Sequence, residues 1–138
     1  MDAGGGGGAA ASAIRRERHR HLHTLLIGPD ACGYLQSDFL LGVFMLGPRT
    51  FYRDHRHAAP ELYLNLSDKS EWRLNAQDWQ EYPAGSLIWN EAEAIHATRV
   101  NDMPFISVFI WLKNVKTPCI TFPVNDWGEI ETDLEKRT

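Results

Sequence analysis

Short apolar runs, each ended by turn residues, constrain the fold of this chain more than any other feature. Examples are FLLGVFML (39–46), ELYLNLS (61–67), SLIWN (86–90) and FISVFIWL (105–112). They recur roughly every ten residues, and after residue 38 no longer segment carries a 3.6-residue apolar period. This pattern predicts an all-β fold, a closed barrel or a sandwich, with helix only at the two ends.

The other expected strands lie between these runs, in TFYRDHRH (50–57), SEWRL (70–74), IHATRV (95–100) and CITFPV (119–124). The sequence is therefore divided into a flexible, glycine-rich leader (1–13), a segment that packs on the barrel (14–37), the barrel itself (38–123) and a C-terminal tail (124–138).

Composition limits the class of protein. The 138 residues carry a net charge of -4, with 43% hydrophobic and 23% charged residues, which indicates one soluble domain. The acidic balance argues against a general nucleic-acid binder. No apolar run approaches the ~20 residues that span a bilayer, and no signal pattern begins the chain, so we expect no membrane partner and a cytoplasmic location.

Two further features of the sequence allow alternatives. Cys32 and Cys119 permit one disulfide, but the favoured interpretation is two reduced cysteines in the core. His19, His21 and His23 repeat at a spacing of two, as metal ligands on a strand do. Because four arginines surround them and would repel a cation, we favour a solvated or edge segment there.

The stretch HRHAAPELY (55–63) concentrates groups that bind metals. His55 and His57 share one face of a strand, and Glu61 and Tyr63 share one face of the next. Pro60 cannot donate a ladder hydrogen bond, which suits a bend between the two strands. Such a bend brings both histidines over Glu61.

A distant residue completes this set. His96 lies near the start of another expected strand, after a turn at Gly85, and can face the histidine pair across a sheet or barrel. His55, His57, Glu61 and His96 would then bind a divalent transition metal (Fe²⁺, Mn²⁺, Ni²⁺ or Zn²⁺) and leave positions open for a small-molecule substrate.

Three aromatic residues are candidates for the rest of the pocket. Tyr63 points to the same side as Glu61, and Trp111 shares a face with Phe105 and Phe109. Tyr52 lies just before the histidines, but strand alternation places it on the opposite face unless the strand is bulged. Tyr63 and Trp111 also have a purely structural interpretation, as residues of the core.

The pattern H-x-H-x3-E, followed by a glycine and a histidine eleven residues later, resembles the two motifs of the cupin superfamily over residues 38–123. The departures from that pattern, at Asp68, Ser86 and Glu91, affect turns and not ligands. The resemblance implies a double-stranded β-helix, a small jelly-roll-like barrel, whose metal ligands are the four residues above. It also implies a homodimer, since cupin barrels commonly pair.

Within that superfamily, Y-x2-H-x-H-x3-E-x-Y with a later histidine and tryptophan resembles the cupin-type dimethylsulfoniopropionate lyases, which form dimethyl sulfide and acrylate. The resemblance implies that Tyr63 is the catalytic base, that Tyr52 binds substrate or assists, and that Trp111 is a wall of the substrate pocket. The alternatives are another cupin enzyme, such as a dioxygenase or an isomerase, and a cupin domain that binds a ligand without turnover.

Overall fold

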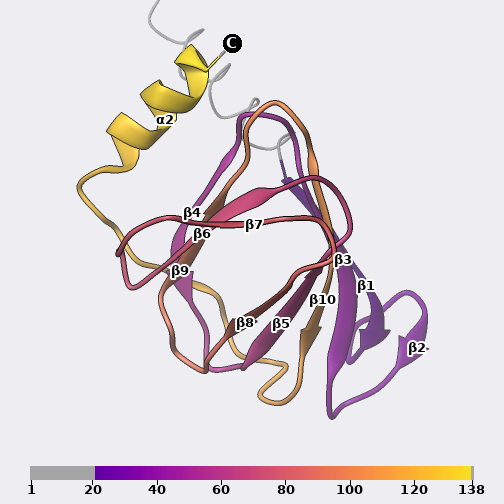
Figure 1. Cartoon of the computed structure of the whole chain (residues 1–138). Coiled ribbons are helices and arrows are strands. Elements are labelled where there is room, and N and C mark those ends of the chain that lie inside the picture. The colour runs from indigo at the N-terminus through magenta and orange to yellow at the C-terminus, as the bar shows by residue number, and fades with distance from the viewer. Residues whose placement is uncertain (1–20, 138) are drawn as a thin grey trace, which may run out of the picture.

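The computed structural model describes residues 21–137, which form two packed β-sheets and one helix (Figure 1). Sheet A has the strand order β2-β1-β3-β10-β5-β8 and sheet B the order β11-β4-β9-β6-β7. The strands of sheet A are β1 (His21–Gly28), β2 (Tyr34–Leu35), β3 (Leu40–Leu46), β5 (Glu61–Asn65), β8 (Leu87–Asn90) and β10 (Phe105–Trp111). Those of sheet B are β4 (Phe51–Arg56), β6 (Ser70–Leu74), β7 (Gln80–Tyr82), β9 (His96–Arg99) and β11 (Ile120–Thr121). The all-β prediction is confirmed, as two facing sheets and not as a closed barrel.

Alternation along the strands decides which side chains enter the core. In β10 the buried positions are Phe105, Ser107 and Phe109, and in β5 they are Glu61, Tyr63 and Asn65. The inner faces of the two sheets enclose a cluster that also contains Phe44, Leu46, Trp72, Ile88 and Val100. The same inner faces carry the polar residues of the candidate site. The alternation of inward and outward side chains along each strand therefore positions both the core and the candidate site.

Gly42 in β3 is required by close packing across sheet A. A Cβ atom at this position would lie 2.8 Å from the ring of Phe109 and 2.3 Å from the carbonyl oxygen of Thr24. Both distances are too short for any side chain, so glycine lets β3 approach its two neighbours.

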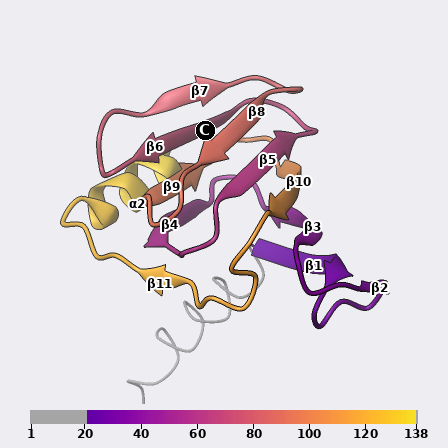
Figure 2. The same ribbon diagram turned by 90° about the horizontal axis from the view of Figure 1, so that it is seen from below.

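The helix α2 (Trp127–Lys136) lies on the side of sheet B, away from β1 and β3 (Figures 1 and 2). Arg73 on β6 is 2% exposed and binds Asp54 on β4 and Asp126, which precedes the helix. The indole Nε1 of Trp127 donates to Asp54 Oδ2 at 2.8 Å. Buried charges therefore fix the helix to this sheet.

Two expectations were wrong or incomplete. Cys32 and Cys119 are free but exposed, because Cys32 lies in the loop between β1 and β2 and Cys119 immediately precedes the edge strand β11. The prediction of core cysteines is therefore incorrect. The strands β2 and β7 were not expected, because β2 has only two residues and β7 has three, of which two are the polar Gln80 and Glu81.

The segment with three histidines falls partly outside the described residues, which exclude His19. His21 and His23 belong to β1, which lies between β2 and β3 in sheet A, and both side chains are exposed. The leader (1–13) also lies outside the described residues. Within residues 21–137, no helix is long and apolar enough to cross a membrane.

Candidate metal centre

Three buried histidines and one buried glutamate, from adjoining strands, converge between the two sheets. His55 on β4 is the cross-strand partner of His96, the first residue of β9. His57 follows β4, and after the bend at Pro60 the strand β5 begins with Glu61. All four side chains have at most 6% of their surface exposed. The structure thus brings together the four residues expected to bind metal.

The distances within this group suit a single ion. One ligand nitrogen from each of His55, His57 and His96 can be chosen so that all three lie within 4.8 Å of one another. Glu61 Oε2 lies 3.2 Å from Nε2 of His57 and 3.3 Å from Nε2 of His96. The four groups therefore face a common centre.

Each histidine is anchored through Nδ1 to a backbone carbonyl two residues away. The pairs are His55 with Arg53 (2.7 Å), His57 with Ala59 (2.8 Å) and His96 with Ala94 (2.9 Å). Because a carbonyl only accepts, the proton of a neutral ring lies on Nδ1 and the lone pair on Nε2. Hydrogen bonds of this kind fix the tautomer and orientation of histidines that bind metals.

The donor set fits a cation on physical grounds. The Nε2 lone pairs of His57 and His96 both face a carboxylate oxygen, which also only accepts when ionised. Nε2 of His96 is fully buried and makes no hydrogen bond to any residue of the described part of the chain, 21–137. Such an arrangement of acceptors is unfavourable unless a positive charge lies among them. A divalent transition metal bound by His55, His57, His96 and Glu61 would supply that charge.

The pKa values follow from the same surroundings. Burial lowers the pKa of His55 to about 3, with a further contribution from His96, so that its imidazole is neutral and its lone pair is available at pH 7. Burial alone would raise the pKa of Glu61, but its contacts with His57 and His96 outweigh that effect and lower it. The carboxylate is therefore ionised.

Trp111 holds the glutamate from the other side. Its indole Nε1 donates to Glu61 Oε1 at 2.7 Å, and its ring stacks on that of His57 at 4.3 Å between centroids. Trp111 is the cross-strand partner of Glu61 between β10 and β5. The structure thus places this residue against two of the four candidate metal ligands.

A bulge places Tyr52 beside the histidines. The register of β4 against β9 shifts between Tyr52 and His55. Regular alternation would place Tyr52 on the face opposite His55, and this bulge brings the two side chains to the same face. The ring of Tyr52 then lies 4.6 Å from that of His55 and 5.0 Å from that of Phe44. Burial raises the pKa of Tyr52, which remains a neutral hydrogen-bond donor.

Tyr63 lies deeper, between the site and the core. It is buried, and its ring contacts Trp72 at 4.8 Å and Phe109 at 6.1 Å between centroids. Burial raises its pKa well above the usual value, and so does the nearby charge of Glu61. Tyr63 is thus at once a core residue and a neighbour of the metal centre.

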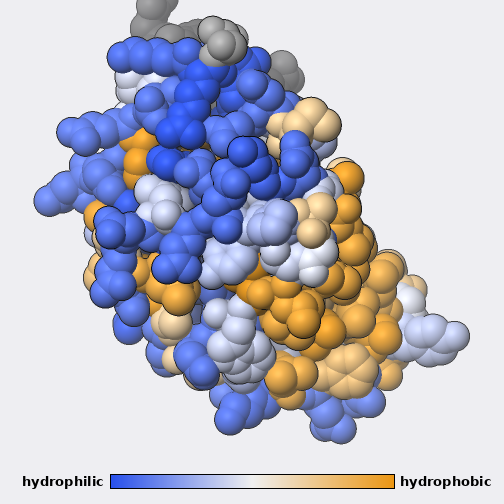
Figure 3. Space-filling model, in the orientation of Figure 1, coloured by the Kyte–Doolittle hydropathy of each residue, from blue (hydrophilic) through white to orange (hydrophobic). Residues whose placement is uncertain are grey.

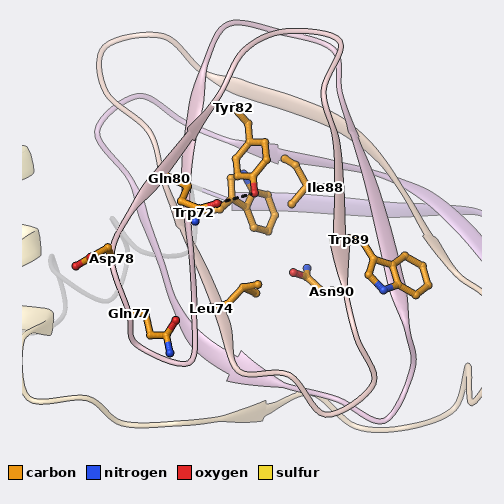
Figure 4. A pocket seen from close by; sticks show the side chains of 9 residues that line it. All are labelled: Trp72, Leu74, Gln77, Asp78, Gln80, Tyr82, Ile88, Trp89 and Asn90. Atoms are coloured by element: carbon orange, nitrogen blue, oxygen red, sulfur yellow. Dashed lines mark hydrogen bonds between the residues drawn. The ribbon is translucent and has the colours of Figure 1, made fainter.

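A cavity of about 410 Å³ adjoins this centre between β6, β7 and β8 (Figure 4). Its lining includes Trp72, Leu74, Tyr82 and Ile88. Asn90 also lines it and donates from Nδ2 to Glu61 Oε2 at 3.4 Å. Asn90 was missed by sequence reasoning, although its alternation with Ile88 in LIWN marks it as an inward polar residue.

The chain resembles known proteins in sequence. The family model for dimethylsulfoniopropionate lyase matches residues 6–107. The dimethylsulfoniopropionate lyase DddQ of Ruegeria pomeroyi is 28% identical over 93 residues, which are 66% of this chain and 46% of that protein. This chain therefore spans about half the length of the curated relative it matches.

Solved structures agree with the sequence comparison. The crystal structure of DddQ from Ruegeria pomeroyi is 25% identical, covers 75% of this chain and 52% of its own, and superposes with a TM-score of 0.69. A cupin-like protein from Thermotoga maritima is only 9% identical but covers 84% of this chain and 86% of its own, with a TM-score of 0.68. The second likeness shows the cupin fold alone. Since the family model matches most of the chain and includes the whole candidate metal centre, this chain belongs to the dimethylsulfoniopropionate lyase family.

Proposed function

We propose that this chain is a metal-dependent lyase that cleaves dimethylsulfoniopropionate, or a similar small carboxylate, to dimethyl sulfide and acrylate. The observation that carries the proposal is the cluster of three histidine nitrogens around an ionised carboxylate, in a chain of this family. The cation would be Fe²⁺, Mn²⁺, Ni²⁺ or Zn²⁺. When bound, it supplies positive charge for the substrate carboxylate and for the negative charge that develops beside it.

The reaction needs a base, and Tyr63 is our candidate. Its phenolate oxygen removes a proton from the carbon next to the substrate carboxylate. The carbon electrons form the new double bond, and the bond to sulfur breaks toward the sulfonium, which leaves as neutral dimethyl sulfide. Because the leaving group is neutral, no general acid is needed. Burial and Glu61 raise the pKa of Tyr63, so a bound cation is needed to favour its phenolate.

The neighbouring residues have positioning roles in this proposal. Trp111 holds Glu61 and packs on His57, which keeps both in place. Tyr52, packed on His55, stays protonated because its pKa is raised. Its hydroxyl is thus a suitable donor to the substrate carboxylate.

The experiment combines metal analysis with a headspace assay for dimethyl sulfide. Purified, metal-loaded protein should release dimethyl sulfide and acrylate in equal amounts. Tyr63→Phe should lower the rate at least a thousandfold, the upper range of the contribution of a general base, and leave metal content unchanged. Tyr34→Phe, at a residue 79% exposed, is the matched control and should have no effect.

Three outcomes would contradict the lyase, and a fourth would contradict the role of Tyr63 as the base. A folded, metal-loaded protein that releases no dimethyl sulfide is not this lyase. Oxygen uptake with small carboxylates would indicate a dioxygenase instead, and a tightly bound small molecule without turnover would indicate a binding domain. Loss of metal from Tyr63→Phe would assign Tyr63 to metal binding or to the scaffold.

A further inference from the structure

The segment that follows β10, residues 112–122, runs along the part of the chain that carries two of the candidate metal ligands. We call this segment the strap. At one end Leu112 donates its backbone N–H to the carbonyl of Pro60 at 3.3 Å, and at the other Phe122 donates to the carbonyl of Asp54 at 2.8 Å. Between them β11 pairs with β4. Figure 2 shows the strap passing beside β4 on its way to the helix α2. The strap therefore contacts the chain on both sides of the two histidines.

Two side chains of the strap hold one residue, Ala58, which directly follows His57. Thr117 Oγ1 accepts a hydrogen bond from the backbone N–H of Ala58 at 3.4 Å, and Asn114 Nδ2 donates to the carbonyl of Ala58 at 3.2 Å. Because that carbonyl only accepts, the amide nitrogen of Asn114 must be the atom that faces it. The N–H and the carbonyl belong to the two planar peptide groups that flank Ala58, so both planes are held.

The position of Ala58 decides how His57 is oriented. Nδ1 of His57 is bonded to the carbonyl of the next residue, Ala59, at 2.8 Å. Ala59 is fully buried, and its carbonyl lies one peptide group beyond the carbonyl that Asn114 holds. Asn114 and Thr117 thus reach the imidazole through two successive backbone groups, and a hydrogen bond to Nδ1 orients a histidine that binds metal.

The turn that presents these two side chains is fixed by its own contacts. The backbone N–H of Thr117 donates to the carbonyl of Asn114 at 3.0 Å, which closes the turn. Val115, between them, packs against the hydrophobic core. Asn114 has a φ of 54°, in the left-handed region that asparagine tolerates better than most residues. Asparagine therefore suits this position both through its backbone and through its amide.

A second loop holds the carbonyl of His57 itself, but without a side chain. The backbone N–H of Glu93 donates to that carbonyl at 2.9 Å. This contact survives any side-chain substitution that keeps the backbone N–H. The contacts of Asn114 and Thr117 with Ala58, in contrast, depend on side chains and can be removed one at a time.

We propose that Asn114 and Thr117 are positioning residues of the metal centre, which fix the bend 57–60 and so direct His57 toward the cation. The inference rests on metal binding in the proposed function and not on the lyase reaction. The strap supplies no ligand in this proposal; it holds one in place.

The first test is the affinity of the purified protein for Zn²⁺, measured by competition with a chelator. Asn114→Asp keeps the shape of the side chain and tolerates the same φ, but its ionised carboxylate cannot donate to the carbonyl of Ala58. Affinity should fall about fivefold, less than the 10–100-fold typical of a residue bonded directly to a ligand, because Asn114 acts through the backbone. Added negative charge alone would strengthen cation binding, so a loss of affinity reports on position.

Matched variants separate the role of these contacts from charge and turn formation. Asn75 has a φ of 52° in the exposed turn between β6 and β7, so Asn75→Asp makes the same change in the same backbone conformation and should leave affinity unchanged. Thr117→Val keeps the shape of the side chain but removes the acceptor for Ala58, and affinity should fall about fivefold. Thr117→Ser keeps the hydroxyl and should retain the wild-type affinity.

Two further measurements report on the bend itself. The visible absorption of the Co²⁺-loaded protein depends on coordination geometry and should shift in Asn114→Asp and Thr117→Val but not in Thr117→Ser. In the metal-free protein, hydrogen exchange at the N–H of Ala58 should be faster in Thr117→Val. Figure 3 shows both hydrophilic and hydrophobic surface at the lower end of the molecule, where the strap turns in Figure 1. Asn114 is exposed there, so its variant should fold as the wild type does.

The outcomes separate this inference from the lyase. Wild-type affinity and Co²⁺ absorption in both Asn114→Asp and Thr117→Val would overturn it, whether or not dimethyl sulfide is released. An equal loss in Asn75→Asp would show a general effect of charge and would also overturn it. Strap-dependent affinity in a protein that releases no dimethyl sulfide would support the positioning role and refute the lyase. A wild type that binds neither Zn²⁺ nor Co²⁺ would overturn both. If Thr117→Val fails to fold, Asn114→Asp decides the question.

Discussion

The two sheets share the candidate site on their inner faces but differ on their outer faces. Sheet A contributes Glu61, Tyr63 and Trp111, and sheet B contributes His55 and His96. Outside, sheet A is apolar and uncovered by the described residues, whereas sheet B carries charged residues and the helix α2. Apart from the bulge in β4, the strands of both sheets alternate in the same way, so the difference between the outer faces lies in the residues that point outward. It follows that the inner faces define the chemistry and the outer faces define what each sheet packs against.

A buried ion pair lies on the outer face of sheet B. Its loss should have the largest effect on stability of the changes considered. Arg73 contacts Asp54 at 2.6 Å, and the two side chains are 2% and 0% exposed. Arg73→Met leaves the Asp54 carboxylate buried without its partner and should lower the free energy of unfolding by about 3–5 kcal/mol. Urea denaturation measures this loss.

The matched control distinguishes an unpaired charge from lost packing. The double variant Arg73→Met with Asp54→Leu should recover most of the stability, since an apolar pair can replace a buried ion pair. A surface ion pair contributes at most about 1 kcal/mol. If Arg73→Met lowers the free energy of unfolding by less than that, the buried ion pair does not hold this face of sheet B together.

Lowering the pH should destabilise the metal-free protein, because His55, on the inner face of sheet B, stays unprotonated in the fold. The folded pKa of His55 is lowered to about 3 from 6.5, mainly by burial. Between these values the unfolded chain binds a proton that the folded chain does not. Stability should therefore fall as the pH is lowered from 6.5 to 4.5, by about 1.4 kcal/mol per pH unit for this proton. Denaturation in the presence of a chelator measures the slope.

The control for the acid effect removes the titrating group. His55→Gln should reduce the slope by one proton over this range and leave the contribution of Glu61 unchanged, which appears at lower pH because the pKa of that carboxyl is lowered. A wild-type curve that is flat from pH 6.5 to 4.5, or that is identical in the variant, would contradict the assignment.

The sequence predicted the parts of the molecule that depend on local alternation. The strand β6 was expected with its observed bounds, and the four candidate metal ligands, which the structure brings together, were chosen in part because His55 with His57, and Glu61 with Tyr63, share strand faces. Contacts that depend on register between distant strands were not predictable. The pairing of Arg73 with Asp54, and of Trp111 with Glu61, joins residues 19 and 50 positions apart.

The errors have physical causes as well. Tyr52 could not be placed without the bulge in β4, because a single extra residue reverses the face of every preceding side chain. The cysteines were expected in the core because free cysteine is usually buried. Both lie in connections at sheet edges, where no second layer covers them.

The smallest predicted effect is that of a substitution at Trp111, which tests how far sheet A supports the candidate metal centre. Trp111→Phe keeps an aromatic ring on His57 but removes the hydrogen bond to Glu61 Oε1. Loss of a partner that orients a ligand typically weakens metal affinity 10–100-fold, and because Phe keeps the stacking we expect about tenfold, near 1.4 kcal/mol. Competition with a chelator measures the affinity. Trp89→Phe makes the same change at an outward position of sheet A and should leave affinity unchanged, since Trp89 is 41% exposed and alternates with the buried Ile88 and Asn90. Equal affinities in both variants would mean that sheet A contributes only Glu61 to the centre, and that the histidines of sheet B determine its strength.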